Sequence, residues 1–202
     1  MRSLIFIAAA AATIVGCVSM ERSPALGDAG NLIFEKDAYG NEFIVEAKYS
    51  YKLANPTEKD ALPLCVSQIV ENRSVGVKGN TTSIGPYTGR LYTQQISSTL
   101  GGGQVIRYVS DDRKKVIAEG AATYETGSAF VSRNVRYVLT AKTEEQALNL
   151  SFGKLEHVQL DSGVASNNGY GKIGSWAGAT PDKALEKIKS VAEALHQCLT
   201  HT

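Results

Sequence analysis

The chain has almost no surplus charge of either sign. Its 202 residues include 21 Lys and Arg residues and 20 Asp and Glu residues, which gives a formal net charge of +1. A protein that binds nucleic acid needs a basic surplus to neutralise phosphates, so this balance argues against that class. The composition is 43% hydrophobic and 20% charged, which excludes collagen-like, low-complexity and wholly disordered chains. The length indicates a single domain with room for a tail.

Motifs of catalysis are also lacking. The three histidines, His157, His196 and His201, form no HExxH motif, and no Gly-x-Ser-x-Gly elbow is present. The glycine run at 101–103 lacks the Lys and Ser or Thr that follow a phosphate-binding loop. The acidic pairs at 111–112 and 144–145 fall in predicted turns, where solvated carboxylates make poor acid–base pairs. We therefore predict a non-enzymatic protein without cofactor or metal.

No hydrophobic run is long enough for a comfortable membrane span, but a short one begins the chain. Residues 4–15 are twelve uncharged residues that follow Arg2. This length fits the apolar region of a signal peptide, whereas a membrane-spanning helix needs about 20 apolar residues. The alternative is a buried N-terminal helix, which is disfavoured because the run has no polar face at helical spacing.

The run ends in the motif Ile14-Val15-Gly16-Cys17. This motif resembles the lipobox of bacterial lipoproteins. The resemblance implies that residues 1–16 are a signal peptide and that Cys17 is acylated, with chains such as palmitate anchoring the protein in a membrane. Val18 is not Asp, which in the enterobacterial sorting pattern favours the outer membrane, and we expect its periplasmic face. Residues 17–30 are expected to be the lipidated Cys and a flexible tether with a reach of roughly 20 Å.

Residues 31–202 are expected to form one α+β domain. Strict alternation over 43–53 predicts a strand, with a hairpin partner at 32–35. An apolar run at 64–70 predicts a core strand, and 75–77 is expected to return beside it. Further strands are predicted at 105–109, 116–124, 135–139 and 148–160, the last with a bulge at Gly153; together they form an antiparallel meander sheet.

Two helices are expected beside this sheet. Residues 88–100 predict a short amphipathic helix, although their Thr and Ser content suits a strand nearly as well, and 75–86 is expected to be mostly loop. Pro181 begins an amphipathic C-terminal helix whose apolar stripe should cover the sheet. The order of elements resembles that of small lipoprotein domains with TBP-like folds, and more loosely helix-grip proteins. No residue motif carries this likeness, so it implies no site.

If Cys17 is acylated, Cys65 and Cys198 remain. An even pair in an exported protein predicts a disulfide, which here would join the last helix to the predicted core strand. The alternative is two unpaired cysteines that act as small apolar core residues.

A glycine-rich segment at 166–178 is the one candidate binding site in the body. It carries Tyr170, Lys172 and the single tryptophan, Trp176, next to the start of the last helix. Such a segment is able to bind a sugar ring, a peptide or an anion. The alternative, which we favour, is that Trp176 packs onto the core while the glycines form turns.

These features lead to three functional hypotheses. The first is a non-catalytic cell-envelope lipoprotein that binds a protein or peptidoglycan partner, with no nucleic acid or metal involved. The second is a carrier that holds an apolar ligand or lipid between the sheet and the C-terminal helix, which requires an apolar cavity of some 300–1,000 Å³. The third is an inhibitor of a wall-degrading enzyme, which would present a rigid exposed loop.

Overall fold

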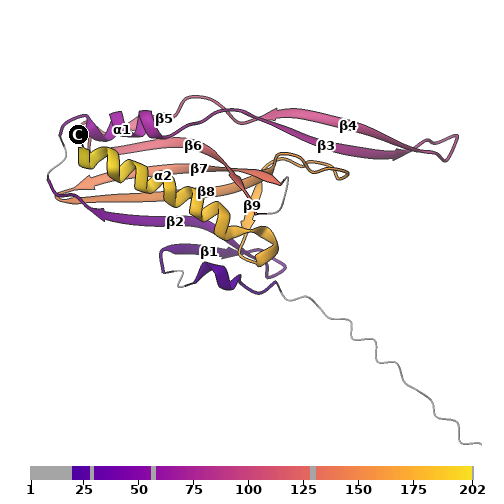
Figure 1. Ribbon diagram of the computed structural model, residues 1–202, viewed down its shortest axis with the longest axis horizontal. Coiled ribbons are helices and arrows are strands. Elements are labelled where there is room, and N and C mark those ends of the chain that lie inside the picture. The colour runs from indigo at the N-terminus through magenta and orange to yellow at the C-terminus, as the bar shows by residue number, and fades with distance from the viewer. Residues whose placement is uncertain (1–19, 28–29, 56–57, 128–130, 202) are drawn as a thin grey trace, which may run out of the picture.

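The computed structural model describes residues 20–27, 30–55, 58–127 and 131–201. Its architecture is α+β, as predicted, with two helices on a large antiparallel sheet and a separate two-stranded sheet that projects from the body (Figure 1). In chain order the elements are η1 (Pro24–Leu26), β1 (Leu32–Lys36), β2 (Glu42–Lys52), α1 (Ala61–Ile69), β3 (Val75–Ile84), β4 (Leu91–Leu100), β5 (Ile106–Val109), β6 (Lys115–Glu125), β7 (Ser132–Glu144), β8 (Ala147–Gln159), β9 (Gly171–Gly174), η2 (Ala177–Ala179) and α2 (Pro181–His201).

The large sheet has seven strands in the order β1-β2-β9-β8-β7-β6-β5. Strands β5 to β8 follow one another as antiparallel neighbours, which confirms the predicted meander. Strand β2 pairs with both β1 and β8, so the N-terminal hairpin extends the same sheet. Strand β8 has a bulge next to the predicted position rather than at it. Gly153 pairs with Val138, and the register with β7 shifts beyond it, where Lys154 has a φ of 51°.

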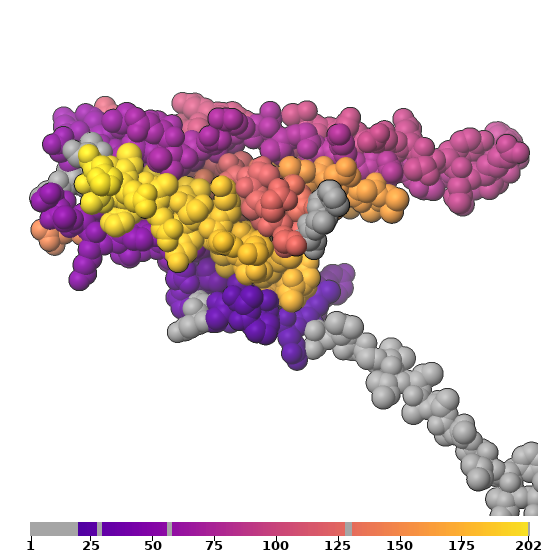
Figure 2. All heavy atoms as spheres, in the orientation of Figure 1, coloured from indigo at the N-terminus to yellow at the C-terminus, as the bar shows by residue number. Residues whose placement is uncertain are grey.

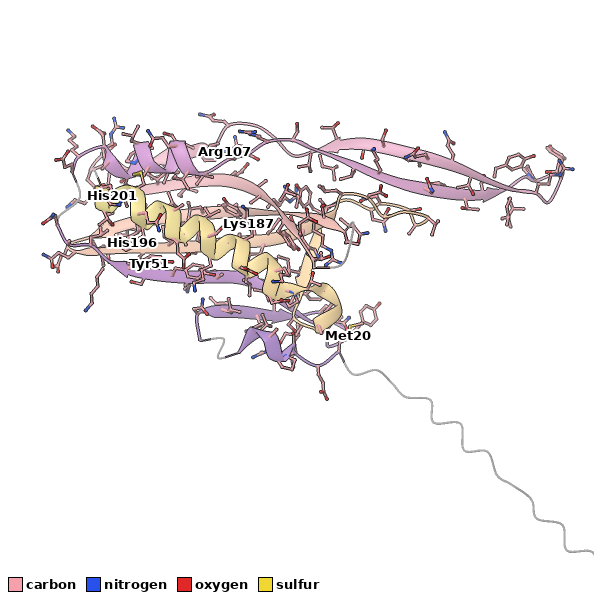
Figure 3. The ribbon with its side chains drawn as sticks, in the orientation of Figure 1. Met20, Tyr51, Arg107, Lys187, His196 and His201 are labelled. Carbon is pink, nitrogen blue, oxygen red and sulfur yellow. A yellow bond between two sulfur atoms is a disulfide. The ribbon has the colours of Figure 1, made fainter. Side chains whose placement is uncertain are left out.

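Helix α2 covers one face of this sheet (Figure 1). Its buried residues recur at helical spacing, as the sequence predicts, and face the alternating apolar residues of the central strands. The largest buried side chains on both sides of this interface are fully enclosed: Phe152, Leu139, Leu148, Leu150, Ile188 and Leu195. Near the C-terminal end of α2, the ring of His196 stacks on that of Tyr51 from β2 at a centroid distance of 4.7 Å (Figure 3).

The strand predicted at 64–70 is wrong, because these residues belong to helix α1. Ala61, Leu62, Cys65 and Val66 are the buried residues, and this spacing matches one face of a helix rather than alternate positions of a strand. The apolar run is too short for its length alone to distinguish the two. Pro63 lies in the first helical turn, where its missing N–H costs no hydrogen bond.

The predicted disulfide between Cys65 and Cys198 is present, with Cα atoms 5.8 Å apart. It joins α1 to α2, so the expected link between a strand and the last helix is corrected to a link between two helices. Both helices pack on the sheet, and the bond fixes one against the other across 133 positions of the chain.

The helix predicted at 88–100 and the loop predicted at 75–86 are also wrong. Both segments are strands, and β3 pairs with β4 over ten residues from Val75 with Leu100 to Ile84 with Leu91. The alternative noted from their Thr and Ser content is therefore the correct one. We call the whole hairpin, residues 75–100, the arm.

Part of the segment expected to be a tether packs against the body. Arg22 forms an isolated antiparallel bridge with Trp176, and the N–H of Ser23 donates to the carbonyl of Ser175 at 2.8 Å. The guanidinium of Arg22 binds both carboxylate oxygens of Glu42, at 2.8 and 2.9 Å. The chain is therefore attached to the sheet at Arg22 and Ser23.

Candidate binding site

The glycine-rich segment lies on the sheet and includes a strand that the sequence did not predict, β9. The buried Ile173 faces the core beneath α2, so its neighbours Lys172 and Gly174 point to the opposite face. We call this opposite face the open face, because α2 does not cover it.

Tyr170 is attached to the open face by two contacts. Its hydroxyl donates to Oδ1 of Asn134 at 2.7 Å, and the guanidinium carbon of Arg136 lies 4.2 Å from the centre of its ring. Arg136 in turn donates to Glu156 at 2.6 Å. The polar groups around Tyr170 are therefore bound to one another.

Lys172 and Trp176 both lie close to the ring of Phe43 from β2. The Nζ atom of Lys172 is 3.2 Å from a carboxylate oxygen of Glu35 and 5.7 Å from the centre of the Phe43 ring. Trp176 meets the same ring edge to face at 5.5 Å. It also packs over Gly174, where an added Cβ would come within 2.4 Å of the indole.

These contacts define what the segment does in the fold. Trp176 is half-buried on the rim of the sheet rather than enclosed in the core. Each of the three predicted residues has a partner inside the protein, which explains how a glycine-rich segment is held in a fixed conformation. A ligand-binding role for Tyr170, Lys172 and Trp176 stays a prediction.

The arm is a second candidate site, which sequence analysis missed. From Thr81 to Thr99 every residue except Gly85 is exposed, and the hairpin projects far beyond the rest of the described body (Figure 2). Large apolar side chains gather near its turn. Tyr87 is 99% exposed, Leu91 is 70% exposed and Ile84 is 67% exposed. Arg90 is the only charged residue between Gly79 and Gln104.

The base of the arm is attached to the body along β3. The N–H of Lys78 donates to Leu160 O at 2.8 Å and the N–H of Asn80 donates to Ala165 O at 3.0 Å. Gly79 allows this approach, because a Cβ there would come within 2.6 to 2.8 Å of atoms of Ser162, Asn167 and Ala165. The arm is therefore fixed at its base, and from Thr81 to Thr99 it has no backbone hydrogen bond to the body within the part of the chain that the structure describes.

His157 lies beside the aromatic side chain of Tyr124. The Nδ1 atom of His157 is 2.9 Å from the hydroxyl of Tyr124, and burial lowers the pKa of His157 to about 4. Burial also raises the pKa of Tyr124 to about 12. Both groups are therefore neutral near pH 7, and they stabilise the fold between β6 and β8.

The described residues contain no group of three or more His, Cys, Asp or Glu side chains placed to hold a metal ion. In the same part of the chain, no helix has the length and apolar character needed to cross a membrane. Cys17, the predicted acylation site, lies outside the described residues.

A surface hollow of about 550 Å³ lies between α2, β6 and the segment that joins α1 to β3. Its lining mixes apolar groups such as Ile69 and Val191 with charged ones such as Glu71, Arg73 and Lys187. This mixed rim differs from the enclosed apolar chamber that a lipid carrier requires.

Comparisons of the chain with protein-family models, with curated proteins and with solved structures find no match.

Proposed function

We propose that the protein is a non-catalytic cell-envelope lipoprotein, anchored through acylated Cys17, that acts by binding a protein partner with the arm. The observation that carries the binding role is the arm itself: two ten-residue strands that project from the body with exposed side chains on both faces.

An exposed two-stranded hairpin is costly to maintain without a partner. An isolated hairpin is marginally stable in water, and large apolar side chains grouped on a surface are typical of interaction sites. Tyr87, Leu91 and Ile84 bury little surface against the body, because each is at least 67% exposed. A binding partner would cover these side chains and the unpaired strand edges together.

The anchoring part of the proposal is supported by the lipobox motif and by the disulfide. A bond between Cys65 and Cys198 is typical of proteins in oxidising compartments, including the bacterial periplasm. Attachment through acyl chains at the periplasmic face of the outer membrane also needs no basic surface patch, which agrees with the near-zero net charge.

The packing beneath α2 favours this proposal over the carrier hypothesis. Phe152, Leu139 and Ile188 are all fully buried, so side chains fill the space in which an apolar ligand would lie. The inhibitor hypothesis remains the second candidate, because the turn of the arm is an exposed loop held between paired strands. In it the N–H of Gly85 donates to Arg90 O at 2.9 Å, and an inhibitor would insert this turn into an enzyme cleft.

Site-specific photocrosslinking in cells tests the binding role. A photoreactive residue at Tyr87 should give a discrete protein adduct. The same residue at Tyr39, a body tyrosine that is 91% exposed, should not. The binding role is wrong if Tyr87 yields no more adduct than Tyr39. An adduct with a wall-degrading enzyme, together with loss of that enzyme's activity, would favour the inhibitor instead.

Replacement of Cys17 by Ser tests the anchor. The variant should accumulate as unprocessed, non-acylated precursor, as measured by mass spectrometry of the membrane fraction. If Cys17→Ser still gives a mature, acylated, membrane-bound product, the anchoring part of the proposal is wrong.

A further inference from the structure

The outer edge of β4 presents a row of backbone groups that no described residue pairs with. The N–H groups of Lys78 and Asn80 in β3 point away from β4, toward Leu160 and Ala165. Their cross-strand partners, Ser97 and Gln95, therefore form non-hydrogen-bonded pairs and also point their own N–H and C=O groups outward. By alternation the same holds for Leu91, Thr93 and Thr99.

The two edges of the arm are not equivalent. The edge of β3 is covered at its base by hydrogen bonds with residues 160–165. Along the edge of β4, from Leu91 to Thr99, no described residue supplies a backbone partner. One edge of the arm is thus partly closed, and the other is open over its whole length.

The open edge also lacks the features by which proteins protect such edges. Lysine, proline and bulges on an edge strand prevent pairing with another chain. Strand β4 contains no charged residue and no proline, and its pairing with β3 runs without a register shift. An edge of this kind favours the addition of a further strand.

We propose that β4 pairs in antiparallel fashion with β4 of a second copy of this chain. The inference rests on the proposed function in that it assigns the partner of the arm. A register centred on Gln94 places Thr93 opposite Gln95 of the second copy in a hydrogen-bonded pair. The same register places Tyr92 opposite Ile96 in a non-hydrogen-bonded pair, and such aromatic–β-branched pairs stabilise sheets.

Charge and symmetry favour a second copy over a different protein. Arg90 is the only charge on the outer arm, and in this register it lies opposite Ser98, so two copies meet without like charges side by side. The pairing is two-fold symmetric and gives a four-stranded sheet whose outer edges are the two β3 strands. The pairing uses the same edge of both copies, so it closes as a dimer, and residues 160–165 cover the base of each remaining β3 edge.

Disulfide trapping of the full-length lipidated chain in cells tests the register. Gln94→Cys should give a covalent dimer, because the two introduced side chains lie opposite each other at the two-fold axis. Thr81→Cys is the matched control, since Thr81 is the cross-strand partner of Gln94 and is also exposed, but it lies on β3. The inference is wrong if Gln94→Cys forms no more dimer than Thr81→Cys.

Proline substitution tests which edge is used. Thr82 and Thr93 are cross-strand partners whose hydroxyl oxygens lie 3.4 Å apart, and neither N–H bonds within the arm. Thr93→Pro removes a donor from the β4 edge, and Thr82→Pro removes one from the β3 edge. In the Gln94→Cys background, Thr93→Pro should lower the dimer yield about tenfold, while Thr82→Pro should leave it near its original level. Equal losses would contradict the inference.

The outcomes separate this inference from the proposed function. If Tyr87 crosslinks a different protein and Gln94→Cys forms no dimer, the arm is a binding element and the second copy is not its partner. If Tyr87 forms no protein adduct and Gln94→Cys forms no dimer, both proposals fail. Crosslinks from Tyr87 to lipid alone would assign the arm to the membrane surface and would also overturn both.

Discussion

Asn134 is a buried polar side chain that joins three segments on the open face of the sheet. It is 2% exposed, its Nδ2 donates to Thr123 Oγ1 at 3.1 Å, and its Oδ1 accepts from Tyr170 at 2.7 Å. Both ends of the amide are therefore used, and a single residue joins β6, β7 and the glycine-rich segment. A buried polar group in this arrangement stabilises the folded state only while its hydrogen-bond partners remain.

Replacing Asn134 by Ala should destabilise the protein by about 1–3 kcal/mol, because the hydroxyls of Tyr170 and Thr123 lose a buried partner. Tyr170→Phe removes only one hydrogen bond and should cost about 1 kcal/mol. Urea unfolding of the two variants and the wild type measures both values. Equal stabilities for wild type and Asn134→Ala would contradict this role.

His157 should make the fold sensitive to acid. Burial lowers its pKa to about 4, below the ordinary value of 6.5, so the folded state holds the imidazole neutral and protonation favours unfolding. The stabilisation is complete above pH 6.5 and is lost as the pH falls toward 4. The loss attributable to this group is about 3 kcal/mol at most.

Unfolding free energies of wild type and His157→Asn between pH 7 and pH 3.5 test this dependence. Asn keeps a side-chain oxygen near the hydroxyl of Tyr124 but does not titrate in this range. The difference between the two proteins should change across the interval from 6.5 to 4. If the unfolding free energies of the two proteins change with pH in parallel, His157 does not cause the acid sensitivity.

At the scale of the element, the two helices depend on their covalent link. The entropy model for a closed loop of 133 positions gives about 4–5 kcal/mol of stabilisation, as an upper bound because the unfolded chain keeps some structure. The double variant Cys65→Ala/Cys198→Ala should therefore unfold at a markedly lower urea concentration than the oxidised wild type. Wild type in reducing agent should shift in the same direction, and an unchanged midpoint in both would contradict the estimate.

The elements that the sequence predicts correctly are those with one buried face. Strand β2 alternates because one side of it faces α2, and α2 carries a stripe because one side of it faces the sheet. The spacing of hydrophobic residues follows the buried face of an element, so β2 and α2 could both be predicted from the sequence alone. Helix α1 could not, because four buried residues in a nine-residue helix leave too short a pattern to distinguish a helix from a strand.

The arm could not be predicted for the opposite reason. Strand β4 is exposed on both faces for nine of its ten residues, so no period marks it. Its conformation is set by pairing with β3, a contact between separate segments that no single window of sequence contains. The same holds for the site: Tyr170, Lys172 and Trp176 stand out by residue type, whereas their partners Asn134, Glu35 and Phe43 lie far away in the chain.

For the whole molecule, the outer arm should be dispensable for folding. Residues 82–93 can be replaced by Asn-Gly, which links Thr81 to Gln94 through a two-residue turn. Thr81 and Gln94 are a hydrogen-bonded cross-strand pair, which is the kind of pair that such a turn closes. The body should keep its unfolding free energy within about 0.5–1 kcal/mol, because all removed residues except Gly85 are exposed and none has a backbone hydrogen bond to the described body. Thermal unfolding of both forms measures this, and a large loss would show that the arm supports the core.

This shortened form also provides the cleanest control for the proposed function. It should retain acylation and the native disulfide while losing every adduct that forms through the arm. An intact adduct pattern would place the binding surface elsewhere on the body.

The attachment of Arg22 to the sheet has a consequence for how copies meet. Five peptide units separate Cys17 from Arg22, and at about 3.5 Å each they span at most about 18 Å. With Cys17 acylated as proposed, every body is kept within one shallow layer above the lipid, and diffusion becomes lateral rather than three-dimensional. Two arms then meet by diffusion within a plane, and this confinement raises their effective concentration well above that of the same protein in bulk solution. A pairing too weak to detect with soluble protein would become populated at the membrane.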